Sequence, residues 1–133
     1  MPDNLAKDTR RLALDHLTVV DTDPLELAKV AAEAGCTAIC PFLHSMDVLP
    51  DMPRYDLVTD AGLRAEFKAQ TAAFDLQVDV AYPFTLAKHT ILSDLAPVLD
   101  TAAGVGAFSV NALLYERDPA PRADKFAQFC DEA

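Results

Sequence analysis

The sequence predicts an α/β fold of four strand–helix units, in which parallel strands are joined by right-handed helical crossovers. Strand-like and helix-like segments alternate four times along the 133 residues. Residues 25–39 resemble residues 96–110, a spacing of two such units. The composition, 51% hydrophobic and 24% charged, is that of a globular chain that can bury a core. We therefore expect one domain over residues 12–133, preceded by an N-terminal segment, residues 1–11.

The first unit has the clearest local signals. Residues 12–20 are mostly apolar and end in β-branched side chains, which predicts a strand. Asp23 is suited to cap the following helix, Pro24 suits its first position, and Glu26 lies at capping-box spacing. The helix is expected to end at Gly35, because glycine commonly follows a helix C-terminus.

The second strand is predicted over residues 37–43, although Pro41 removes one backbone donor from it. A longer loop follows over residues 44–58. Thr59 is expected to cap the second helix, and residues 77–83 are expected to form the third strand.

The third helix is expected to open at Ser93, because apolar residues then recur at helical spacing. Gly104 and Gly106 mark its end, and residues 107–114 are predicted as the fourth strand. Apolar residues recur at helical spacing again up to residue 133, which predicts a fourth helix.

The charge pattern excludes several classes of protein. Lys and Arg total 11 against 21 Asp and Glu, which gives a formal net charge of −10. No basic run occurs, so we expect no nucleic-acid partner. Polar residues interrupt each apolar run, so we expect no contact with the membrane interior. The N-terminus lacks an apolar signal core, and the three cysteines complete no zinc pattern, which favours a cytoplasmic protein.

Several segments resemble a known family. Leu-Asp-His-Leu-Thr at 14–18, Asp-Pro-Leu-Glu-Leu-Ala at 23–28 and Ala-Ala-Glu-Ala-Gly at 31–35 are similar to the start of the sugar phosphate isomerase/epimerase family, the xylose isomerase-like TIM barrels. The later helices and the fourth strand are similar as well. The resemblance implies that the chain is the N-terminal half of a (β/α)₈ TIM barrel, a half-barrel with four strands.

The resemblance also implies chemistry. Family members carry out metal-dependent aldose–ketose isomerisation or epimerisation of sugars, often with Mn, Mg, Co or Zn. Their ligands are typically Glu, Asp, His and Glu, one from each of strands five to eight. Those strands have no counterpart in the four predicted here, so no metal ligand is transferred to this chain. We expect the chain to supply a substrate-facing wall and to be inactive alone.

Two other readings stay open. The chain could be a non-catalytic, self-associating half-barrel that binds a small ligand. It could also be a doubly wound, flavodoxin-like domain, but it lacks a fifth strand and a glycine-rich turn after the first strand.

Candidate binding residues follow from the barrel prediction, because barrel enzymes place their sites at the C-terminal ends of the strands. The predicted contacts to a sugar-like substrate are His16, His44, Tyr82 and Asn111. His16 would share a strand face with Leu14 and Thr18 and could transfer a proton. Its other reading is a buried structural histidine. Glu116 and Asp118 are expected to face water.

The predicted sheet also bears on partners. A four-stranded parallel sheet exposes two edges and a broad apolar face, which must be covered. We therefore expect a homo-oligomer, or a partner chain that supplies the other half-barrel.

Overall fold

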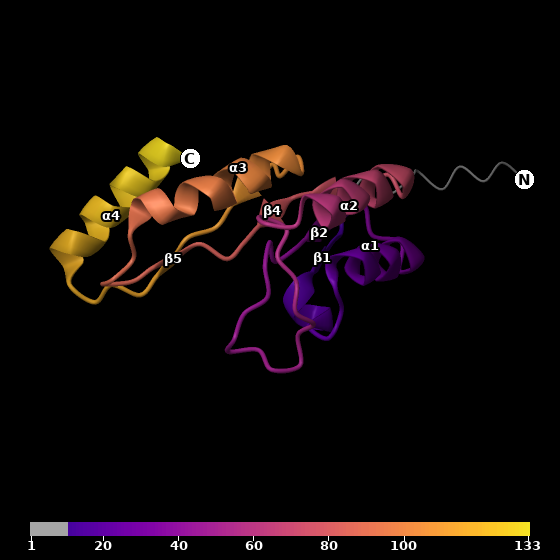
Figure 1. Ribbon diagram of the computed structural model, residues 1–133, viewed down its shortest axis with the longest axis horizontal. Coiled ribbons are helices and arrows are strands. Elements are labelled where there is room, and N and C mark those ends of the chain that lie inside the picture. Colours follow the sequence, from indigo (N-terminus) through magenta and orange to yellow (C-terminus); the bar gives the residue numbers. More distant parts are fainter. Residues whose placement is uncertain (1–10) are drawn as a thin grey trace, which may run out of the picture.

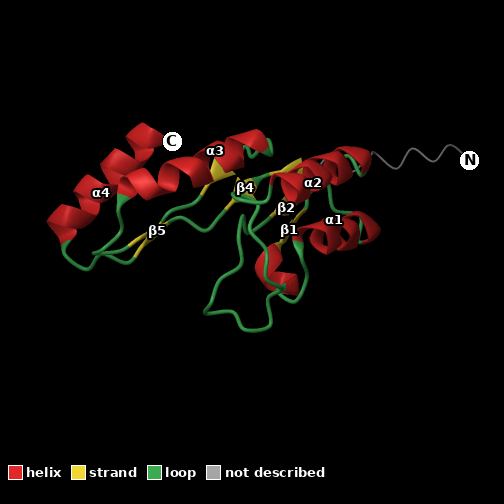
Figure 2. Ribbon diagram, in the orientation of Figure 1, coloured by secondary structure: helices red, strands yellow, loops and turns green. Residues whose placement is uncertain are grey.

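In the computed structural model, which describes residues 11–133, short parallel strands and four α-helices form a mixed α/β fold (Figures 1 and 2). The strands are β1 (Ala13–Asp15), β2 (Ala38–Cys40), β3 (Gln77–Val78), β4 (Val80–Ala81), β5 (Thr85–Leu86), β6 (Ser109–Val110) and β7 (Leu113–Leu114). The helices are α1 (Pro24–Glu33), α2 (Ala61–Ala73), α3 (Ala96–Gly104) and α4 (Pro119–Glu132), with 3₁₀ helices η1 (His16–Val19) and η2 (Leu92–Leu95). Apart from Arg11, the predicted N-terminal segment lies outside the described residues.

Strand pairing is parallel throughout the named strands. β1 pairs with β2 and β2 with β3, while β4 pairs with β6 and β5 with β7. A single residue, Asp79, separates β3 from β4, so both belong to the predicted third strand. The predicted fourth strand is likewise divided into β6 and β7. The pairings therefore follow the predicted order of the four units, with shorter strands than expected.

The helices share one hydrophobic core with the sheet. Leu14, Ile39 and Val78 are neighbours in register, so they point to the same face. Each α-helix adds buried side chains to the cluster that includes Ile39 and Val78, for example Leu27, Phe67, Ala102 and Phe129. Figure 1 shows α2, α3 and α4 in a row above the strands, while the loop after β2 projects from the opposite side.

The caps of the first helix are confirmed. The Asp23 carboxylate accepts a hydrogen bond from the backbone N–H of Glu26 at 2.8 Å, and the Glu26 side chain accepts one from the backbone of Asp23 at 3.3 Å. Gly35, with φ of 79°, occupies the left-handed conformation that glycine adopts without strain. These local signals specify where α1 begins and ends.

The predicted first strand is too long. The observed strand β1 ends at Asp15, whose carboxylate accepts a hydrogen bond from the backbone N–H of Leu17 at 2.9 Å and so caps η1. Because the chain turns there, His16, Leu14 and Thr18 do not share a strand face, and that prediction was wrong. The second strand similarly ends at Cys40, immediately before Pro41.

Two predicted helix starts also need correction. Asp60, not Thr59, caps α2, because its carboxylate accepts a hydrogen bond from the backbone of Leu63 at 2.9 Å. The turn that contains Ser93 is the 3₁₀ helix η2, and α3 begins only at Ala96. Within residues 11–133, no helix has the length and apolar character needed to cross a membrane.

Candidate functional site

The predicted binding residues all lie near the C-terminal ends of strands. His16 follows β1, His44 follows β2, Tyr82 follows β4 and Asn111 follows β6. The structure brings His16 and Tyr82 together, because both rings pack against Phe42, at centroid distances of 5.6 and 4.1 Å. Among residues 11–133, no hydrogen bond or ring contact joins His44 or Asn111 to this pair.

His16 is completely buried, and both of its ring nitrogens are used within the protein. Its Nδ1 accepts a hydrogen bond from the backbone N–H of Phe42 at 3.1 Å, so the ring proton belongs to Nε2. That nitrogen donates to the carbonyl of Thr22 at 2.8 Å. Burial lowers the pKa of His16, so the ring is neutral near pH 7. This geometry favours the structural reading of His16 over a role in proton transfer.

Two tyrosines complete an aromatic cluster around His16. Tyr55 lies nearly parallel to the His16 ring, with centroids 6.1 Å apart, and its hydroxyl donates to the carbonyl of Phe42 at 2.8 Å. The Tyr82 hydroxyl donates to the Asp15 carboxylate at 2.5 Å. Burial raises the pKa of both tyrosines, so the hydroxyls stay protonated and act as donors. The cluster thereby links the ends of the first three strand–helix units.

Tyr55 is a residue that the sequence did not single out. It lies in the long loop after β2, where no periodicity predicts packing. The loop is closed at its base by hydrogen bonds from Ser45 to Tyr55 at 2.9 Å and from Leu57 to Leu43 at 2.8 Å. His44 lies in this base, with Nδ1 3.1 Å from the carbonyl of Ser45.

Asn111 differs from the other predicted residues in its hydrogen bonding. Its side-chain oxygen is buried and has no hydrogen-bond partner among residues 11–133. Buried acceptors are usually paired with a donor. The Asn111 side-chain oxygen can therefore accept a hydrogen bond from a ligand or from a backbone N–H of a neighbouring segment.

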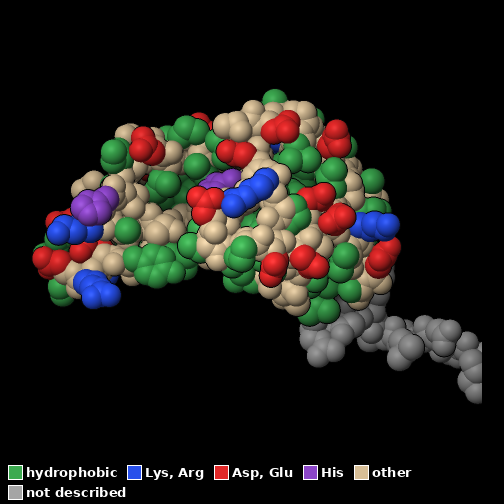
Figure 3. All heavy atoms as spheres, turned by 60° about the horizontal axis from the view of Figure 1, so that its bottom comes forward, with side chains coloured by type: hydrophobic (Ala, Val, Ile, Leu, Met, Phe, Trp, Pro, Cys, Tyr) green, Lys and Arg blue, Asp and Glu red, His purple; other side chains and the backbone are tan. Residues whose placement is uncertain are grey.

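A second polar region lies where β5 and β7 end and α4 begins. A cavity of about 740 Å³ is lined there by the basic or histidine residues Lys88, His89, Arg117 and Lys125, by the acidic residues Glu116 and Asp118, and by Tyr115. In Figure 3, basic, acidic and histidine side chains gather at this end of the molecule, on the left of the view. Lys88, His89 and Arg117 are exposed, so their side chains are accessible to a solute.

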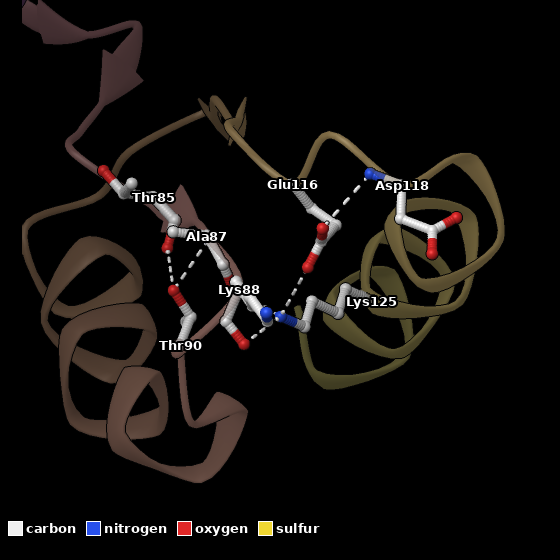
Figure 4. Close-up of polar contacts among 7 residues, drawn as sticks. All are labelled: Thr85, Ala87, Lys88, Thr90, Glu116, Asp118 and Lys125. Carbon is white, nitrogen blue, oxygen red and sulfur yellow. Dashed lines mark hydrogen bonds and ion pairs between the residues drawn. The ribbon is translucent and has the colours of Figure 1, made fainter.

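Lys125 ties the loops of this cavity together (Figure 4). Its Nζ donates to the carbonyls of Ala87 at 2.5 Å and Lys88 at 2.7 Å, and lies 3.4 Å from a carboxylate oxygen of Glu116. Glu116 also accepts a hydrogen bond from the backbone N–H of Asp118 at 3.2 Å. The hydrogen bond from Asp118, and then Lys125, lower the pKa of Glu116, so the carboxylate stays charged.

The prediction that Glu116 faces water was wrong. Only 8% of its surface is exposed, because the loop folds its carboxylate toward Lys125 on α4. Thr90 holds the turn that carries Lys88, accepting a hydrogen bond from the backbone of Ala87 at 2.8 Å and donating to the carbonyl of Thr85 at 3.0 Å (Figure 4). Lys125 and Glu116 are therefore positioning residues for the loops that carry Lys88 and Arg117.

The described residues do not fit the metal that the resemblance implies. Within residues 11–133, no group of three or more His, Cys, Asp and Glu side chains is arranged to hold an ion. We therefore assign no chemical step to a metal held by these residues.

The fold and its cavity define an α/β protein with parallel strands and a polar cavity, lined by basic and acidic side chains, at the C-terminal ends of two of them. The chain matches no known protein-family model and no curated protein sequence.

Proposed function

We propose that the chain is the N-terminal half of a sugar isomerase- or epimerase-like (β/α)₈ barrel and that it binds a sugar phosphate. The observation that carries the proposal is the cavity beside β5 and β7, where Lys88, His89 and Arg117 are exposed together. Ligands of parallel α/β folds bind at this end of the strands. In a chain of net charge −10, a cavity in which Lys88 and Arg117 outnumber the exposed carboxylate of Asp118 suits an anionic group.

Each cavity side chain has a distinct role in this proposal. Arg117 presents a planar guanidinium that can bind two phosphate oxygens at once, whereas Lys88 acts as a point charge. The phenol of Tyr115 is also exposed on the cavity wall, and in this proposal it hydrogen-bonds a sugar hydroxyl. Lys125 does not contact the phosphate, because its amine is already bound to Glu116 and two carbonyls.

Catalysis of isomerisation needs groups beyond those described in residues 11–133. In the proposed whole barrel, the other half supplies the divalent metal site and the group that moves the proton. This half supplies the phosphate-binding wall and the aromatic cluster that joins the first three units.

A second candidate is a non-catalytic, small-ligand-binding module. The observation that favours it is the state of His16, whose two ring nitrogens are both bonded to the backbone. Both candidates bind a ligand, and only turnover in the presence of the other half distinguishes them.

Binding of a phosphorylated sugar is expected to depend on the two cavity cations. Calorimetric titration should detect glucose 6-phosphate and show weaker binding of glucose. The double variant Lys88→Gln, Arg117→Gln should weaken glucose 6-phosphate binding by about tenfold or more, because each charged hydrogen bond contributes about 1.5–3 kcal/mol. The matched control is Arg54→Gln, an exposed arginine paired with Asp47 in the loop after β2.

The outcomes of the titration separate the possibilities. Equal binding of glucose and glucose 6-phosphate, or an unchanged affinity in the double variant, contradicts the phosphate assignment. Equal binding of glucose 6-phosphate and inorganic phosphate means that the cavity recognises the anion but not the sugar.

The isolated chain is expected to show no isomerase or epimerase turnover when Mn, Mg, Co or Zn is added. The reason is that residues 11–133 contain no cluster of three metal-binding side chains. The measurement is the NMR spectrum of a panel of aldoses, ketoses and their phosphates, incubated with pure protein. Product formation that stops when a chelator is added would show this expectation to be wrong.

A further inference from the structure

The described strands form one three-stranded and two two-stranded sheets, and the first strand and the last two strands among them have open edges. Within residues 11–133, β1 pairs only with β2, while β6 and β7 pair only with β4 and β5. The outer backbone groups of these strands therefore have no ladder partner, and such edges readily accept a further strand. Figure 1 shows α1 and β1 toward one end of the molecule, and β5, the partner of β7, with α4 toward the other.

The edge at β6 and β7 carries an apolar hollow. The hollow has a volume of about 460 Å³, is lined only by apolar residues and lies between these strands and α4. Its main side chains are Val110, Leu114, Phe126 and Phe129. Leu114 and Phe126 are each 43% exposed, whereas Phe129 is buried at the base. The hollow thus has the shape and polarity to receive side chains from a strand added to this edge.

The opposite edge carries side chains that match. Leu12 and Leu14 lie on the same face of the chain around β1, because residues two apart in a strand point to the same side. That face is the helix-covered one, since Leu14 lies beside Ile39 in register. Leu12 is 60% exposed and Leu14 is half-buried. If the β1 segment of another copy lies parallel to β7 with its helix-covered face on the side of α4, both leucines point toward α4.

We propose that a second copy of this chain docks its β1 edge against the β6–β7 edge of the first, with Leu12 in the apolar hollow. A twofold axis then pairs the remaining edges in the same way, so that two copies close one ring of parallel strands. Both contacts are needed, because a stable dimer buries on the order of 1,200 Å² or more and one edge of a few residues is too short for that.

This inference rests on the half-barrel part of the proposed function, and it agrees with the non-catalytic candidate, because a second copy then occupies the place of the half that would supply the metal site. Its test measures mass instead of ligand binding, so the two proposals can fail separately. Light scattering behind a sizing column should give twice the chain mass of 14.4 kDa at micromolar concentration. Because each copy carries a net charge of −10, the dimer should also strengthen as salt is added.

Two complementary variants test the pairing of the edges. Leu12→Asp damages one edge and Phe126→Lys damages the other, so each variant alone should be a monomer. An equimolar mixture should form a one-to-one dimer of the two variants. In that dimer the unchanged β1 edge of Phe126→Lys meets the unchanged β6–β7 edge of Leu12→Asp, and the other contact joins the new Asp to the new Lys. The control Val48→Asp changes a side chain that is 78% exposed in the loop after β2, and it should stay dimeric.

Hydrogen exchange of the unmodified protein supplies a measurement that does not depend on variants. The amides of β1, β6 and β7 should become more protected as the protein concentration rises. A monomeric unmodified protein, dimeric single variants or a mixture that stays monomeric overturns the proposal. Open polymers also overturn it, because they show that the edges meet without closing.

Discussion

Replacing His16 with alanine is expected to lower the free energy of unfolding by about 2–5 kcal/mol. The imidazole is completely buried and bonds to the backbone of Phe42 and Thr22. Removing the ring leaves a cavity, and it leaves the buried N–H of Phe42 and the part-buried carbonyl of Thr22 without partners; each of these changes is destabilising. Urea denaturation measures the loss. The control His89→Ala changes an exposed ring and should alter the free energy by about 0.5 kcal/mol or less.

The same residue predicts how stability depends on pH. Burial lowers the pKa of His16 below its usual 6.5, so the folded protein binds this proton less readily than the unfolded chain. Stability should therefore fall as the pH decreases below 6.5, and this loss should level off at the lower pKa of the folded state. The slope between about pH 7.5 and about pH 5.5 should diminish in His16→Ala and persist in His89→Ala. An identical slope in all three proteins contradicts the assignment.

Replacing Phe84 with alanine is expected to lower the free energy of unfolding by about 3–5 kcal/mol. Phe84 has no exposed surface, lies between β4 and β5, and packs against Phe129 of α4 at a centroid distance of 5.4 Å. A domain of this size is typically stable by about 5–15 kcal/mol, so the loss is a large part of the total. Thermal or urea denaturation checks it.

The matched control is Phe108→Ala. The Phe108 side chain is 83% exposed, so its removal should change the free energy of unfolding by about 0.5 kcal/mol or less. If Phe84→Ala and Phe108→Ala lowered the free energy of unfolding by similar amounts, the Phe108 side chain would have to be buried in solution, contrary to its exposure in the structure.

The spacing of apolar residues predicts which face of a helix packs against the core better than it predicts the burial of individual side chains. The spacing of Leu63, Phe67 and Phe74 predicts that all three lie on the apolar face of the second helix, yet Phe67 has no exposed surface and Phe74 is 40% exposed. Phe74 follows the last residue of α2, where the chain leaves the helix direction. Helical periodicity holds only while the helix continues, so a side chain just beyond its end is poorly predicted.

The candidate site shows a sharper limit of sequence reasoning. His16, Tyr82 and Asn111 were found because the end of a parallel strand is a position that local patterns locate. The roles of these residues depend on partners far along the chain, such as Asp15, which is 67 residues from Tyr82. Similarly, Lys125 binds the carbonyl of Ala87, 38 residues away. No spacing rule connects such groups.

The sequence by itself determined the alternation of strands and helices, the capping box at Asp23 and the helix stop at Gly35. These features depend on backbone conformation and on hydrogen bonds between residues a few positions apart, so local patterns are sufficient. Only the tertiary structure decided that His16 is locked between two backbone groups and that Glu116 is buried against Lys125. Burial and long-range pairing arise when distant segments pack together, and a one-dimensional pattern does not contain those contacts.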